Sequence, residues 1–96
     1  MTGGVFMVRQ TITVCNSNGF HIRPVTIIAD AASGCTSKVT IHYEHNQINA
    51  RSILNLLSFG IKKGTDIIVE CEGEHEQEDL EKMVDVILHK LEKEEE

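Results

Sequence analysis

The sequence predicts an α+β fold, a two-layer open-faced sandwich. A four-stranded, mostly antiparallel sheet carries three helices on one face, in the order β-α-β-β-α-β-α. Stretches that alternate between apolar and polar residues are typical of strands with one buried face. Stretches whose apolar residues recur every three or four positions are typical of amphipathic helices. The 96 residues suffice for one domain, so a single sheet covered on one side buries every apolar face.

The first strand is expected over residues 8–14, whose apolar side chains largely share one face. A turn cluster of Asn, Ser and Gly follows it. A helix is expected to begin just after His21, because Pro24 suits a first helical turn, and to end at Gly34. The apolar residues of this helix recur at helical spacing: Val25, Ile28, Ala31, Ala32 and Cys35.

A hairpin and a short helix are expected next. The segment Lys38–Tyr43 alternates again, and residues 44–46 form a tight turn before a short return strand at 47–49. Ser52 is a preferred N-cap residue for the short, nearly all-apolar helix that follows, and Gly60 ends that helix.

The last strand and the last helix complete the order. Residues 65–72 alternate, with Ile67, Val69 and Cys71 on the inward face. The final helix has the clearest periodicity of the chain and is acidic at its N-terminal end. Its apolar residues are Leu80, Met83, Val84, Ile87, Leu88 and Leu91.

The charge is unevenly distributed. Residues 1–69 carry a net charge of +3 and residues 70–96 carry −9, which gives −6 for the chain. An acidic pI near 5.3 makes nucleic acid a poor partner. The apolar runs are too short to span or insert into a membrane, and the first residues do not form a signal peptide. Three cysteines without a C-x-x-C spacing favour a reducing, cytoplasmic location.

One segment combines residue types that suit phosphoryl chemistry. His21 is expected at or beside the N-cap of the first helix, and Arg23 follows two residues later. The first N–H groups of a helix lack intrahelical acceptors, and an arginine presents five donors in a planar fork. These groups would hold phosphoryl oxygens around a nucleophilic imidazole. The plainer alternative is that His21 is only a helix cap or a solvated residue.

The same residues resemble a known family. Gly19-Phe-His-Ile-Arg-Pro-Val25 is similar to the G-[LF]-H-x-R-P-[AV] site of HPr. HPr is the histidine-containing phosphocarrier of the phosphoenolpyruvate-dependent sugar phosphotransferase system. Residues 49–57 with Ser58-Phe-Gly60 resemble the second signature of that family, and the similarity covers about residues 8–91.

The resemblance implies a role for each matching position. His21 would be phosphorylated on Nδ1 by phospho-enzyme I and discharged to an enzyme IIA, with Arg23 neutralising the phosphoryl group. Ser52 would be the serine that a regulatory kinase phosphorylates in some bacteria and a phosphatase restores. The residues expected to dock partners beside the site are Phe20, Ile22, Ile53, Leu54 and Leu57. The chain would act as a carrier rather than as a stand-alone enzyme, with no cofactor and no metal.

Two other functions stay open within the family. A regulatory binding module would use phosphorylated Ser52 as a ligand for a transcriptional regulator or an enzyme, but the members of that type lack the histidine. A nitrogen-regulatory branch would share the histidine chemistry and have other partners. Ile22 stands where relatives usually have a small residue, and Asp30 stands where several have a base.

Some features point to plainer explanations. His42, His45, Cys71 and His75 lack the context of a zinc site, and the cysteines are expected to be structural thiols. The acidic face of the last helix is expected to be solvated. Residues 1–7 are expected to be an extension, an alternative start or an expression remnant, 8–91 the phosphocarrier domain, and 92–96 a frayed acidic end.

Overall fold

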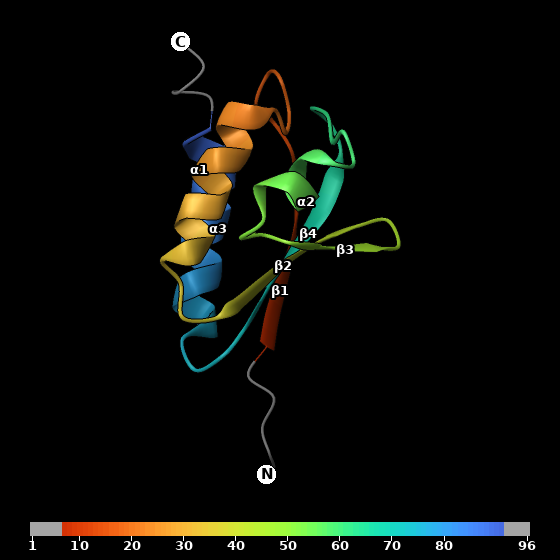
Figure 1. Cartoon of the computed structure of the whole chain (residues 1–96). Helices are drawn as coiled ribbons and strands as arrows, with labels where there is room; N and C mark the ends of the chain where they lie inside the picture. The colour runs from red at the N-terminus through yellow and green to blue at the C-terminus, as the bar shows by residue number, and fades with distance from the viewer. Residues whose placement is uncertain (1–6, 92–96) are drawn as a thin grey trace.

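The computed structural model describes residues 7–91 and confirms the predicted fold class. Figure 1 shows one twisted sheet with the helices packed against it. Most of the expected extension (residues 1–6) and all of the expected frayed end (residues 92–96) lie outside the described residues. The elements are β1 (Met7–Thr13), α1 (Ile22–Ser33), β2 (Lys38–Tyr43), β3 (Asn46–Asn49), α2 (Ile53–Leu57), β4 (Asp66–Glu72) and α3 (Glu76–His89).

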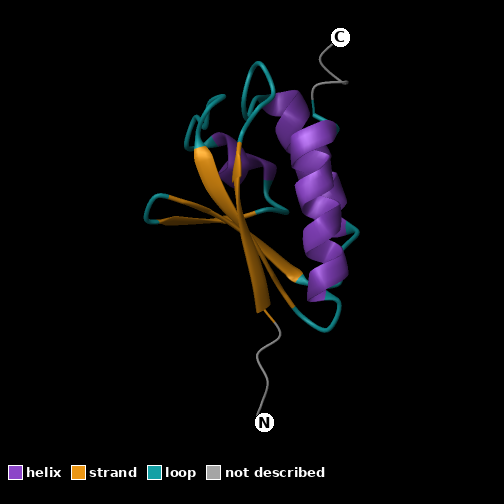
Figure 2. Ribbon diagram, turned by 180° about the vertical axis from the view of Figure 1, so that it is seen from behind, coloured by secondary structure: helices purple, strands orange, loops and turns teal. Residues whose placement is uncertain are grey.

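The four strands form one sheet in the order β1-β4-β2-β3, and all of the pairs are antiparallel. Figure 2 shows α1 and α3 lying together on one side of this sheet. In the central strand β4, Ile67, Val69 and Cys71 are buried beneath the helices. The side chains of Ile68, Glu70 and Glu72 alternate with them on the other face, which the helices leave open.

The core follows the predicted apolar faces. Fully buried side chains include Val14 from the end of β1, Ile41 from β2, Ile48 from β3 and Met83 from α3. Ala32 and Val25 of α1 are also fully buried. The strand faces and helix stripes read from the sequence therefore meet in a single core. Among the described helices, none is long and apolar enough to cross a bilayer.

Helix α2 is shorter than its apolar sequence suggests. Ser52 caps it as predicted, because its Oγ accepts the N–H of Asn55 at 3.1 Å. The helix ends at Leu57, before Phe59. The ring of Phe59 instead packs edge-on against Tyr43, with the ring centroids 6.1 Å apart. Phe59 therefore contacts the β2–β3 hairpin rather than continuing the helix.

Candidate functional site

His21 is the N-cap residue of α1, as the sequence predicts. Its backbone is extended, with φ −86° and ψ −179°, and its carbonyl accepts the N–H of Val25 at 3.0 Å. The imidazole is exposed and makes no capping hydrogen bond within the described part of the chain. The ring is therefore held at the start of a helix with its nitrogens accessible.

The loop before His21 is fixed by a close approach between two segments. Gly19 has a φ of +64°, and a Cβ added to it would lie 2.5 Å from the carbonyl oxygen of Ile61. The next residue, Phe20, donates its N–H to that same carbonyl at 2.9 Å. The side-chain amide of Asn16 also donates to the carbonyl of Gly19 at 2.7 Å. Glycine is required here because no side chain fits between the segments.

Arg23 and Pro24 line a shallow hollow beside the imidazole. Its volume is about 170 Å³, and Asn18, His21 and Ile22 complete its lining. Pro24 has no N–H to satisfy, so it suits the first turn. The N–H groups of Ile22 and Arg23 lie in the first turn of the helix, where no intrahelical acceptor exists. The guanidinium of Arg23 adds positive charge, so the hollow suits an anion with several oxygens.

Ser52 lies at the start of α2, and its hydroxyl already serves as the cap. The neighbouring Arg51 reaches away from the hydroxyl. Its Nη2 donates to the carbonyls of Cys35 and Ser37, at 2.8 and 3.0 Å, and so holds the loop between α1 and β2. Ser52 is half-buried, whereas its neighbour Leu54 is 81% exposed.

Comparison with known proteins agrees with this geometry. The family model described as the PTS HPr component phosphorylation site matches residues 8–88. This chain belongs to the HPr family. It is 35% identical over 77 residues to the HPr-like protein Crh of Bacillus subtilis (strain 168), which covers 80% of this chain and 91% of Crh.

Two solved structures show how closely the fold matches the family. The phosphocarrier protein HPr from Bacillus anthracis str. Ames is 27% identical and has a TM-score of 0.80, covering 84% of this chain and 96% of that one. HPr-C-His from Thermoanaerobacter tengcongensis is 30% identical with a TM-score of 0.79, covering 83% and 90%. The open-faced sandwich of this HPr-family protein is therefore that of the family.

The residues expected to dock partners differ in their exposure. Leu54 and Ile22 are 81% and 60% exposed, and Ile53 and Leu57 are half-buried. Phe20 is only 3% exposed, which corrects the expectation that it presents a docking surface. The bond from its N–H to the Ile61 carbonyl anchors its backbone against the turn after α2, and its ring belongs to the core.

Sequence reasoning missed a cluster on the open face of the sheet. Glu70 Oε1 accepts from Arg9 Nε at 2.8 Å and lies 2.8 Å from His42 Nε2. The side chain of His42 is half-buried beside Glu70. No group of three potential metal ligands gathers within residues 7–91. This cluster lies on strands β1, β4 and β2, so it braces the sheet rather than the His21 site.

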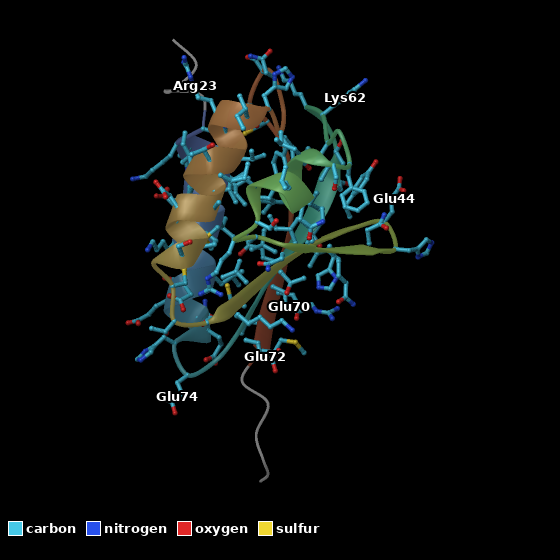
Figure 3. The ribbon with its side chains drawn as sticks, viewed as in Figure 1. Arg23, Glu44, Lys62, Glu70, Glu72 and Glu74 are labelled. Carbon is cyan, nitrogen blue, oxygen red and sulfur yellow. The ribbon has the colours of Figure 1, made fainter. Side chains whose placement is uncertain are left out.

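Several charged residues of the described part of the chain lie at opposite ends of the fold. Figure 3 shows Arg23 and Lys62 at one end and Glu72 and Glu74 at the other. The acidic start of α3, with Glu76, Glu78 and Asp79 in its first turn, follows Glu74 at that second end. The negative charge seen in the second part of the sequence therefore lies, over these residues, far from His21.

Proposed function

We propose that this HPr-family protein is a phosphoryl carrier of the sugar phosphotransferase system. His21 would accept the group from phospho-enzyme I and pass it to enzyme IIA proteins. The observation that carries the proposal is an exposed imidazole at the N-cap of α1, beside Arg23, in a chain of this family. The exposure matters because both donor and acceptor must reach the same nitrogen.

The proposed step is an in-line transfer between two histidines. The lone pair of His21 Nδ1 attacks the phosphorus carried by the donor histidine. The new N–P bond forms as the donor N–P bond breaks, and the donor nitrogen keeps that electron pair. Arg23 and the first N–H groups of α1 stabilise the three phosphoryl oxygens during the transfer. The same groups hold the charge afterwards, so the carrier diffuses while loaded.

The experiment is labelling with phosphoenolpyruvate and the enzyme I of the same organism. We expect one acid-labile phosphoryl group per chain, and we expect His21→Ala to abolish it. His45→Ala is the matched control, because His45 is also exposed but lies in the turn between β2 and β3. The carrier function is wrong if wild-type protein takes no label or if the label survives His21→Ala.

We also propose regulation by phosphorylation of Ser52. The hydroxyl lies at the start of α2, and the exposed Leu54 follows two residues later. A phosphate there would add about −1.5 to −2 charges beside the docking residues and repel an acidic partner. The test is incubation with ATP and a host kinase extract, followed by a search for acid-stable phosphate that Ser52→Ala removes. An extract that labels nothing at Ser52 would contradict this regulation.

The second candidate function is a regulatory binding module, which the similarity to the HPr-like protein Crh favours. In that case Ser52 carries the functional phosphate and His21 stays unmodified. Acid-stable labelling from ATP without any label from phospho-enzyme I would support this module. Label on His21 from the nitrogen-branch enzyme I alone would instead place the protein in that branch.

A further inference from the structure

Two lysines occupy the turn that follows α2. Lys62 and Lys63 are both exposed and form no ion pair within the described residues 7–91. By contrast, Arg9 pairs with Glu70, and Lys90 lies 3.7 Å from a carboxylate oxygen of Asp85. The turn therefore presents two uncompensated positive charges to solvent.

This turn is tied to the His21 loop at both of its ends. Ile61, just before the lysines, accepts the N–H of Phe20 at 2.9 Å. Gly64, just after them, donates its N–H to the carbonyl of Val14 at 2.7 Å. Between these anchors, the Cα of Lys62 lies 2.8 Å from the position that a Cβ on Gly19 would take. The backbone of the turn therefore keeps a fixed position relative to the imidazole.

Arg23 and the lysine turn lie at the same end of the molecule. Figure 3 shows the side chains of Arg23 and Lys62 projecting from that end on different sides, and the loop between β1 and α1 also lies there. Arg23 and the lysine turn thus place three positive charges at the end of the molecule where a phosphoryl group would be exchanged. A partner that carries carboxylates around its own phosphoryl site would meet opposite charge on both sides.

The exposed face of α1 offers much less positive charge. After Arg23, its exposed residues are Thr26, Asp30 and Ser33, and its last turn contains no base. An acidic partner lying along this helix would approach Asp30. The same partner lying across the turn after α2 would approach two lysines. The charge pattern therefore favours one direction of approach over the other.

We propose that Lys62 and Lys63 form the docking edge for the acidic protein that exchanges phosphoryl groups with His21. The partner then covers the turn after α2 and the exposed Leu54, rather than the length of α1. This proposal rests on the carrier function above and adds the side of His21 on which the partner lies. It assigns charge-based recognition to two residues outside both signature segments.

The experiment compares two double variants with equal changes in charge. Lys62→Gln/Lys63→Gln removes the proposed edge. Lys38→Gln/Lys82→Gln is the control, because Lys38 pairs in register with Glu72 and Lys82 Nζ lies near Gly34, both at the end far from His21. Each protein is titrated against a limiting amount of host phospho-enzyme I at low salt and at about 1 M NaCl, where the Debye length is only about 3 Å.

We expect kcat/KM for phosphoryl uptake at low salt to fall about tenfold in the Lys62/Lys63 variant and less than about twofold in the control. At about 1 M salt the variant should match wild type measured in the same buffer, because the ions screen the lost attraction. Equal uptake by both variants at low salt would overturn the proposed edge while leaving the carrier function intact. Absence of label on the wild-type protein would remove the carrier function itself, and this edge with it.

Discussion

The carboxylate of Asp79, in the first turn of α3, accepts the backbone N–H of Ser37 at 2.9 Å. The bond joins the last helix to the segment just before β2. Burial raises the pKa of Asp79, but hydrogen bonding to Ser37 outweighs it and leaves the pKa below its ordinary value. The ionised carboxylate is therefore the form that stabilises the fold.

The first prediction concerns the pH dependence of this contact. Because the folded-state pKa of Asp79 is lowered, its contribution is complete above the unfolded-state pKa and is lost as the pH falls through the folded value. Asp79→Asn should lower the free energy of unfolding by about 1.5–3 kcal/mol at pH 7. Urea unfolding from pH 7 down to pH 2.5 should show the two proteins converging below about pH 4. If the difference in the free energy of unfolding between wild type and Asp79→Asn did not change with pH, the stabilising role of the ionised Asp79 carboxylate would be wrong. Asp30→Asn is the control for the loss of one exposed charge.

The second prediction separates backbone strain from crowding at two glycines. Gly60 has a φ of +58° with open space around its Cβ position, so Gly60→Ala should cost about 1–2 kcal/mol from the backbone alone. Gly19→Ala should cost about 1–3 kcal/mol more, because its Cβ would collide with Ile61 and Lys62. Denaturant midpoints measure the stability of each variant. Equal costs for Gly60→Ala and Gly19→Ala would mean that the loop at Gly19 moves easily away from the turn at Ile61 and Lys62.

The third prediction tests the cap on α2. Ser52→Ala removes the acceptor for the Asn55 N–H and should lower the free energy of unfolding by about 1 kcal/mol. Ser52→Asp should recover much of this loss, because aspartate caps helices about as well as serine. Phosphoryl uptake on His21 should be nearly unchanged in Ser52→Ala, and a large drop would mean that the cap positions the docking residues.

The fourth prediction tests what Arg23 contributes. Arg23→Lys keeps the positive charge but replaces the planar fork by a compact ammonium. The rate of uptake should fall about tenfold in Arg23→Lys and further in Arg23→Gln, at unchanged stability. Single-turnover transfer from phospho-enzyme I measures this directly. Equal rates for the two variants would show that the fork geometry, and not the charge, is what matters.

The fifth prediction concerns the thiols. Burial raises the pKa of Cys71 to about 12 and also raises that of Cys35, whereas Cys15 is exposed. Since the thiolate is the reactive form, an aromatic disulfide reagent at pH 8 should label one cysteine quickly in the native protein and three after unfolding. Cys15→Ser should remove the fast reaction. Rapid labelling that persists in this variant would show that the core opens and exposes Cys35 or Cys71.

Most of the fold could be predicted from local sequence patterns. Each strand and helix could be predicted because its apolar period depends only on neighbouring residues, and Ser52 was identified as a cap for the same reason. The cluster of Arg9, Glu70 and His42 could not be predicted, since it depends on β4 lying between β1 and β2. An antiparallel strand order is set by the packing of the whole chain, which no short segment records.

The candidate site, too, could be predicted from the sequence only in part. The position of His21 at a helix start follows from Pro24 and the pattern behind it. The burial of Phe20 does not, because its ring packs in a core formed by residues that are distant in the sequence. Local patterns alone do not predict such contacts.

Within residues 7–91, the separation of Arg23 and Lys62 from Glu72 and Glu74 contributes an electric dipole moment whose positive end is the His21 end. In the field of an acidic partner, this contribution favours orientations with the His21 end forward before contact, which shortens the rotational search that precedes docking. A phosphoryl group gained at that end adds negative charge there and reduces the moment. The loaded carrier is then held less strongly by the surface that attracted it, so loading itself promotes departure.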